Sequence, residues 1–213
     1  LLEIISAGLT YSLGMALAVS LAAAVFGVLV GYASAVGRPS VRRLFELLTS
    51  VVFIFPGILI AILVMAVVGQ SQLGLMATLA LTGWPSYARI ARGESLRVLG
   101  LPYAEGARAL GMGPVRLFRS VILPSILPFV LVQFILGTSG VVVSESTLGF
   151  LGLGGSEYSW GSMLAMGKSV LLEAPHVCVA LSLAMAGLII GLNLMGDGLR
   201  DHLDPKTRHA GRP

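Results

Sequence analysis

The fold is decided by residues 47–88, which read LLTSVVFIFPGILIAILVMAVVGQSQLGLMATLALTGWPSYA and contain no charged side chain. As one helix these 42 residues would extend about 63 Å, twice the hydrocarbon thickness of a bilayer, so the stretch must fold back on itself. The polar cluster Gly69-Gln70-Ser71-Gln72 is where it can turn. We therefore predict two membrane spans here, at about residues 47–68 and 73–92.

Three further charge-free stretches, residues 4–37, 120–144 and 174–196, are each long enough to cross a bilayer, which takes about 20 helical residues. Of the 213 residues, 56% are hydrophobic and 11% are charged, whereas soluble domains carry about 25% charged residues. We predict an all-α, polytopic transmembrane helical bundle of about five spans, the others being 9–36, 121–143 and 175–196. Without a linker or low-complexity segment, residues 1–213 are expected to form a single domain.

The distribution of positive charge predicts the orientation, because Lys and Arg accumulate in cytoplasmic loops. Three arginines lie at 38–43, six lie at 89–119, and four basic residues lie at 200–212, whereas Lys168 alone falls on the opposite side. The chain is therefore expected to start outside and to have a cytoplasmic C-terminus. The net charge of +4 follows from this topology and gives no support for a nucleic-acid partner.

The cytoplasmic loop at residues 93–120 is the most informative segment. Pro102 near a first turn and Gly111 beyond an end predict a short helix, and Gly113-Pro114 predicts the start of a second. The first helix carries small side chains that would let another surface approach closely. Glu105 and Arg108 are three residues apart and can pair.

The order Glu105-Gly106-Ala107, then Gly111, then Val121-Ile122-Leu123-Pro124 resembles the EAA loop of ATP-binding-cassette (ABC) importer permeases. Gly106 and Val121 depart from that pattern. The resemblance continues in residues 81–89, 148–154, 160–164 and 193–205, and it points to the "C"-type permease of the dipeptide/oligopeptide/nickel subfamily. Such permeases usually have six spans, so the chain is expected to lack the first one.

The resemblance implies a fold like that of type I ABC importer permeases and a bacterial or archaeal cytoplasmic-membrane location. It implies a channel-forming subunit of an ATP-driven importer for peptides, nickel complexes or related small solutes. The expected partners are a homologous permease subunit, two cytoplasmic ATPase subunits and an external substrate-binding protein. The expected coupling residues are those of the loop helix and its C-terminal turn: Glu105, Gly106, Ala107, Arg108 and Gly111.

No catalytic or cofactor site is expected in this chain, and ATP should bind to the partner subunits. Residues 161–169 nearly spell a phosphate-binding loop, but the motif needs four residues between its glycines and here there are five. His176 and Cys178 at i, i+2 do not share a helix face, so no metal site is predicted. We therefore expect this chain to take part in transport without catalysing a reaction itself.

Ionisable groups in membrane segments suggest function. Glu145, together with Ser144, Ser146 and Thr147, could line an outer gate or path, or could simply meet interfacial water. Three polar residues within spans can bond between helices or face a path, and the interhelical role is the one expected for each: Gln133, Ser139 and Asn193. The small pairs Gly27/Gly31 and Gly187/Gly191 are expected at helix crossings, and three prolines are expected to kink or end helices: Pro56, Pro85 and Pro128.

These observations leave two other functions to consider. An ion-gradient-driven secondary transporter would favour carboxylates within spans, which are scarce here. A membrane anchor without a path would need no coupling loop. Transport that requires a separate ATPase distinguishes the importer from both.

Overall fold

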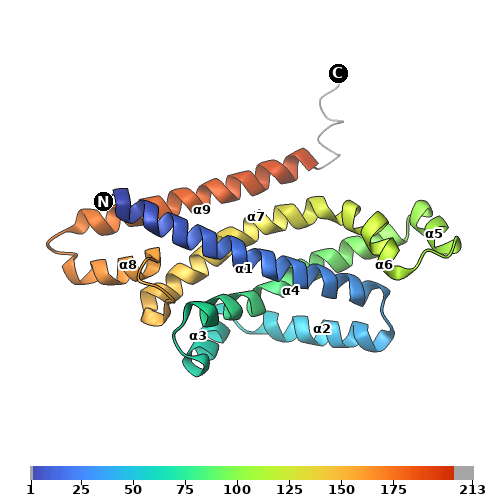
Figure 1. Ribbon diagram of the computed structural model, residues 1–213, viewed down its shortest axis with the longest axis horizontal. Coiled ribbons are helices and arrows are strands. Elements are labelled where there is room, and N and C mark those ends of the chain that lie inside the picture. Colours follow the sequence, from blue (N-terminus) through green and yellow to red (C-terminus); the bar gives the residue numbers. More distant parts are fainter. Residues whose placement is uncertain (1, 204–213) are drawn as a thin grey trace, which may run out of the picture.

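A computed structural model describes residues 2–203, which form an elongated bundle of helices (Figure 1). The bundle begins with α1 (Leu2–Val36), α2 (Pro39–Ile54), α3 (Gly57–Val68) and α4 (Gln72–Leu99). A compact loop region follows, with α5 (Pro102–Ala109), α6 (Pro114–Leu117) and the π-helix η1 (Phe118–Ile122). The remaining elements are α7 (Leu123–Leu148), the π-helix η2 (Gly149–Leu153), α8 (Trp160–Gly167), the 3-10 turn η3 (Lys168–Val170) and α9 (Pro175–Leu203).

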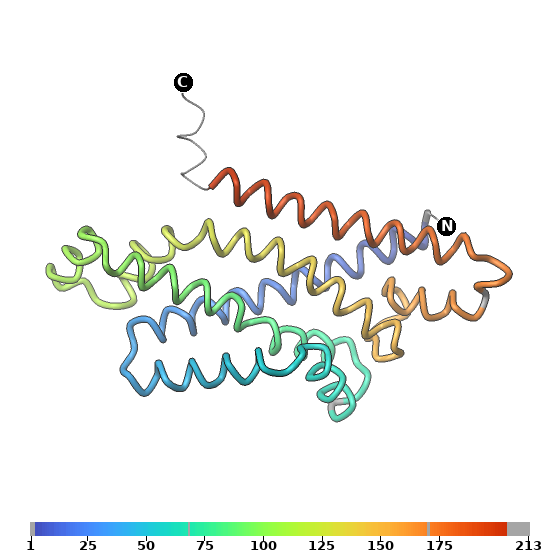
Figure 2. Tube along the Cα trace, turned by 180° about the vertical axis from the view of Figure 1, so that it is seen from behind, coloured from blue at the N-terminus to red at the C-terminus, as the bar shows by residue number. Residues whose placement is uncertain are grey.

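The centre of the bundle is formed by α1, α4 and α7, which pack on one another along their lengths. The two views show α9 on one side of this centre and α2 on the opposite side (Figures 1 and 2). The loop helices α5 and α6 lie at one end, while α8 lies at the other end beside the start of α1. This arrangement confirms the predicted all-α class and places the predicted cytoplasmic loop and the predicted outer segment at opposite ends.

The predicted span 47–68 is wrong as a single helix. Phe55 has extended backbone angles, φ −90° and ψ 136°, and α2 and α3 meet at a bend of 91° around Phe55 and Pro56. Proline disfavours helical angles in the residue before it and lacks an N–H donor, so the helix ends where the sequence places Pro56. By contrast, Pro85 and Pro128 both lie inside continuous helices, α4 and α7.

Among the described residues, three helical segments are long and apolar enough to cross a membrane: Glu3–Val36, Pro114–Leu153 and Pro175–Leu203. The bent pair α2 and α3 would make a fourth if it counts as one span. Helix α4 has 28 residues but falls outside this group, since its second half carries Arg89, Arg92, Glu94 and Arg97. The predicted span 73–92 thus corresponds to a real helix that is more polar than its neighbours.

The contact between α1 and α4 depends on two glycines. A Cβ atom at Gly27 would lie 2.6 Å from the carbonyl oxygen of Trp84, and one at Gly31 would collide with the carbonyl oxygen of Ala88. This confirms the predicted crossing at Gly27 and Gly31. The same prediction is wrong within this chain for Gly187 and Gly191, because no atom of another helix lies within 4 Å of a Cβ at either position.

We expect Gly31→Leu to destabilise the folded chain by about 1–3 kcal/mol or more, because the added side chain overlaps the α4 backbone. Gly187→Leu is the matched control and should leave stability unchanged, since its Cβ meets open space. Thermal unfolding of both variants in detergent measures the difference. Equal midpoints for the two variants would contradict this packing.

Candidate functional site

The loop helix α5 has the bounds that the sequence predicts. Pro102 occupies its first turn after the extended residue Leu101, and the chain leaves the helix through Gly111 at φ +81°. The Met112 amide donates to the carbonyl oxygen of Ala107 at 3.1 Å, which closes the C-terminal turn. A left-handed residue at this position is the usual helix stop, and glycine adopts it without steric cost.

One side of α5 is anchored in the core. Ala104 is completely buried, and Ala107 and Met112 pack around the same apolar cluster. The cluster joins five helices, α1, α4, α5, α6 and α7, and η1, and its buried members are Val28, Tyr32, Ala91, Val98, Leu99, Ala104, Leu117, Ile122, Ile126 and Val130. Because interiors are closely packed, displacement of α5 should be transmitted to the ends of α1, α4 and α7.

The predicted coupling residues divide between two sides of α5. Glu105, Gly106, Arg108 and Gly111 are exposed, whereas Ala107 is half-buried against the core. The expected Glu105–Arg108 pair is absent from the ion pairs of the described residues. Instead Arg108 Nη2 donates to the carbonyl oxygen of Leu99 at 2.8 Å, where the last carbonyls of α4 lack helical partners and attract positive charge.

The exposed side of this region carries large apolar side chains. Tyr103 is 55% exposed, Leu110 is 91% exposed and Val115 is 72% exposed. Tyr103, Gly106 and Leu110 follow a spacing of three and four residues, which places them on one face of α5. That spacing was visible in the sequence, but only the burial of Ala104 shows which face points outward.

A second connection joins α1 to this loop. The hydroxyl of Tyr32 donates to the carbonyl oxygen of Pro114 at 2.7 Å, and its ring packs on Phe118 with centroids 4.6 Å apart. Phe118 begins η1, where the Leu123 amide bonds back to the Phe118 carbonyl in a five-residue turn. Single π turns inside helices often mark functional positions, and η1 is where the loop joins α7.

At the opposite end, Glu145 is completely buried among serine hydroxyls. Ser146 Oγ donates to Glu145 Oε2 at 3.3 Å, whereas Glu145 Oε1 has no hydrogen-bond partner among the described residues. Ser12 and Ser159 lie beside the carboxylate. Ser159 Oγ accepts from the Ser162 amide at 3.2 Å, and Ser12 Oγ accepts from the Trp160 amide at 3.5 Å, so α1, α7 and α8 meet around Glu145.

Close packing around Trp160 strengthens this junction. Trp160 is 1% exposed, and its indole Nε1 donates to the carbonyl oxygen of Ile5 at 3.3 Å. Gly161 lies directly against the Ser146 backbone, where a side chain would not fit. We call the set Glu145, Ser12, Ser146, Ser159 and Trp160 the outer latch.

The four residues predicted for an outer gate or path do not act as one group. Glu145 and Ser146 belong to the outer latch. Ser144 instead lines a central cavity, and its hydroxyl donates to the carbonyl oxygen of Gly140. Thr147 donates to the carbonyl oxygen of Val143, one turn earlier in its own helix. Successive residues on a helix point about 100° apart, so adjacent positions in the sequence reach different surroundings.

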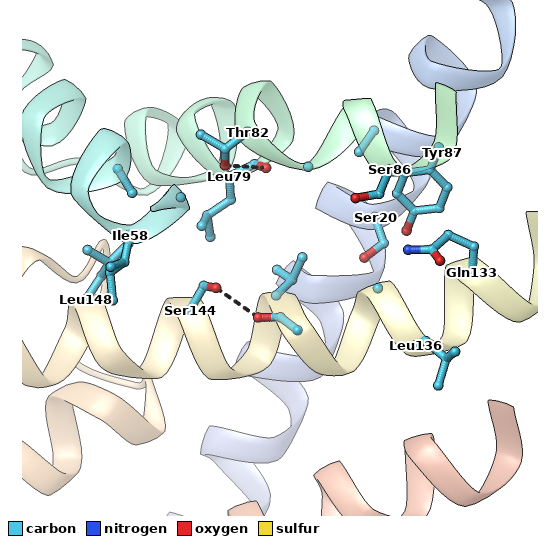
Figure 3. A pocket seen from close by; sticks show the side chains of 17 residues that line it. Ser20, Ile58, Leu79, Thr82, Ser86, Tyr87, Gln133, Leu136, Ser144 and Leu148 are labelled. Carbon is cyan, nitrogen blue, oxygen red and sulfur yellow. Dashed lines mark hydrogen bonds between the residues drawn. The ribbon is translucent and has the colours of Figure 1, made fainter. Parts of the chain in front are cut away.

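The central cavity has a volume of about 480 Å³ and lies between α1, α3, α4 and α7 (Figure 3). Its polar lining is uncharged and consists of Ser20, Thr82, Ser86, Tyr87, Gln133 and Ser144. Gln133 does not take the favoured interhelical role, since its amide faces this cavity, which agrees with the other role considered for it, that of facing a path (Figure 3). The interhelical role is confirmed for Ser139 and Asn193, which bond between α7 and α9 at 3.1 Å.

Comparison with known proteins identifies the family. The family described as the binding-protein-dependent transport system inner membrane component matches residues 23–209. The chain belongs to this family of ABC transporter permeases. The exposed loop helix and the polar cavity are therefore features of a permease subunit, a class that transports rather than catalyses.

Two relatives carry the same name. The glutathione transport system permease protein GsiD of Pectobacterium atrosepticum is 36% identical over 200 residues, and that of Escherichia coli O6:K15:H31 is 35% identical over 202 residues. In both comparisons the match covers 89% of this chain and 66% of the relative's length. The chain thus spans just under two thirds of these permeases.

Solved structures show the same fold. A chain from inward-facing crystals of the MetNI methionine ABC transporter superposes with a TM-score of 0.72 over 93% of this chain and 95% of that chain. A second crystal form gives a TM-score of 0.71. Sequence identity is 20% and 19%, so these matches establish the permease fold and nothing about the cargo.

We expect Glu145→Ala to loosen α8, because the buried carboxyl group that accepts from Ser146 and lies beside Ser159 at the start of α8 is then removed. The expected loss of local stability is about 1–3 kcal/mol, seen as faster amide hydrogen exchange over residues 160–167. Glu157→Ala removes an exposed carboxylate of the same outer segment and should leave this exchange unchanged. Unaltered exchange in Glu145→Ala would show that the carboxylate does not hold the outer latch.

Proposed function

We propose that this chain is the channel-forming subunit of an ATP-driven importer of small peptides. In this proposal residues 1–213 form one transmembrane permease domain, and residues 93–120 are its cytoplasmic coupling loop. The observation that carries the proposal is α5, a helix that is exposed on its Tyr103, Gly106 and Leu110 face and anchored through buried Ala104 on its other face. Such a helix is suited to transmit motion from a cytoplasmic ATPase to the membrane helices.

The partners follow from family membership and from surface chemistry. Two ATPase subunits would bind ATP and receive the α5 helices, and an external substrate-binding protein would deliver cargo to the end that carries α8. A homologous permease subunit would cover part of the apolar surface of α2 and α3, where Ile54, Leu63 and Val67 are each at least 67% exposed. The lipid bilayer would contact α9, whose Leu183 and Leu194 are also largely exposed.

The orientation is supported by charge. The end of the bundle that carries α5 also carries the arginines at 38–43 and 97–119, and Lys168 lies at the α8 end. Positive charge accumulates on the cytoplasmic side, so this proposal places α5 and the C-terminus in the cytoplasm and α8 outside.

The mechanism is alternating access. Closure of the ATPases would bring the α5 helices of the two permease subunits together, and the buried cluster around Ala104 would carry this motion to the ends of α1, α4 and α7. The central cavity would then change the side to which it opens. ATP binding favours one of the two permease arrangements only to the extent that the ATP-bound ATPase binds that arrangement more tightly than the other.

The cavity lining and the relatives favour peptides as cargo. Uncharged hydroxyl and amide groups around an open volume of about 480 Å³ suit the donors and acceptors of a short peptide backbone. The relatives named as glutathione permeases transport a small peptide, which agrees with this chemistry. The ion-gradient alternative is less favoured. A transporter of that class would favour carboxylates within its spans, but the buried carboxylate among the described residues is Glu145, which already accepts a hydrogen bond from Ser146.

The decisive variant is Gly106→Trp in the complete importer. A Cβ at Gly106 meets no atom of this chain within 4 Å, so the bulky side chain should leave the fold intact and block the docking face. Ala107→Trp would be harder to interpret, since Ala107 also packs on the chain's own core. Gly198→Trp, at an equally open glycine near the end of α9, is the matched control.

We expect Gly106→Trp to weaken ATPase binding by about 2 kcal/mol or more and to abolish ATP-dependent uptake. The control should retain both. Co-purification of the ATPase and uptake into reconstituted vesicles measure the two effects. Parental binding and uptake in Gly106→Trp would remove α5 from the coupling mechanism.

A further inference from the structure

A second cleft lies between α2 and α4, nearer to the α5 end than the central cavity. Its volume is about 320 Å³, and its polar and charged lining comprises Glu46, Thr49, Ser50, Arg89 and Arg92. Thr49 Oγ1 already donates to the carbonyl oxygen of Phe45 at 2.8 Å. The groups left for a ligand are the two arginines and the hydroxyl of Ser50.

The cleft has more positive charge than its carboxylate neutralises. Arg92 Nη2 and Arg42 Nε both lie 3.0 Å from the same oxygen of Glu46. The Nε–H of Arg92 is buried and has no hydrogen-bond partner among the described residues. Because this nitrogen is buried, it adds positive charge beside the cleft and is not itself open to a ligand there.

Arg89 has no carboxylate partner among the ion pairs of residues 2–203. Its guanidinium lies over the ring of Phe53, 4.0 Å from the centroid. This stacking orients the guanidinium and leaves its N–H donors free to bind in the plane. The Arg89 guanidinium therefore has a fixed orientation, and its N–H groups can still donate to a ligand.

The position of Arg89 on α4 separates it from the arginines around α5. It lies ten residues before the end of α4 at Leu99, about 15 Å along the helix. It therefore lies beside the cleft, between the central cavity and the loop.

One face of α4 connects this cleft with the central cavity. Ser86 lines the central cavity one turn before Arg89, and Gly93 lines the cleft one turn after it. Residues three and four apart share a helix face. A peptide leaving the cavity along this face would meet Arg89 as its first charged contact.

We propose that Arg89, with Arg92 and Ser50, binds the carboxylate of the transported peptide on its way to the cytoplasm. This inference rests on the proposed importer function and adds a substrate class, peptides with a free carboxylate. A guanidinium presents parallel N–H donors that match the two carboxylate oxygens. Arg92 and Ser50 line the same cleft and add a second positive charge and a hydroxyl donor.

The test places a thiol in the cleft of the complete importer in lipid nanodiscs. Ser50→Cys is made in a Cys178→Ala background, because Cys178 is the chain's only cysteine. Two methanethiosulfonate reagents of similar size, one with a sulfonate and one with a trimethylammonium group, report the local charge through the ratio of their rates. Arg89→Gln is the test variant, and Arg97→Gln, which removes an arginine paired with Glu94 at the surface, is the control.

We expect the sulfonate reagent to react faster, and the ratio of rates to fall by about tenfold in Arg89→Gln but not in Arg97→Gln. Tri-alanine should slow labelling of Ser50→Cys, whereas tri-alanine amide should not, and Arg89→Gln should remove this protection.

Two results would overturn the proposal. A ratio that Arg89→Gln does not change would mean that the cleft is neutral in the assembled importer, for example through a carboxylate of the second permease. Protection by phosphatidylglycerol in the nanodisc, with none by tri-alanine, would identify a lipid phosphate as the occupant. Either result leaves the Gly106→Trp test of coupling unaffected.

Discussion

Burial of Ala104 is the contact on which the rest of this structure depends. It seats α5 against a cluster contributed by the ends of α1 and α4, by α6 and η1, and by the start of α7. A methyl group is small enough to bring the α5 backbone close to the cluster, and a larger side chain would push the helix away. Because one face is buried in this way, the opposite face of Tyr103, Gly106 and Leu110 points outward.

The two ends of the bundle are held by different chemistry. At the α5 end apolar packing dominates, and hydrogen bonds from Tyr32 to Pro114 and from Arg108 to Leu99 join the loop to α1 and α4. At the α8 end a buried carboxyl group lies among the hydroxyls of the outer latch and accepts a hydrogen bond from Ser146. Between them the central cavity is lined by glycines and small polar residues of α4 and α7, so a small rotation of these helices would alter its opening (Figure 3).

The sequence predicts features whose causes are local. Pro102 and Gly111 define α5, and the pair Gly27 and Gly31 identifies the crossing with α4, because each signal is contained within a few residues. Features that depend on tertiary contacts could not be predicted. Pro56 indicates a helix end but not a bend of 91°, and the surroundings of Glu145 include Ser12 from the far end of the chain. Arg108 likewise bonds to Leu99 rather than to its neighbour on the helix, because the end of α4 lies beside it.

The central claim is that α5 moves as one body with the bundle. Spin labels at Ala109 on α5 and at Leu96 on α4, in a Cys178→Ala background, would report their separation by double electron–electron resonance. The account predicts the same distance distribution in the nucleotide-free and ATP-trapped importer, while the distance between the α5 helices of the two permease subunits becomes shorter. A change in the Ala109–Leu96 distribution on ATP binding, in a complex that still transports, would contradict it.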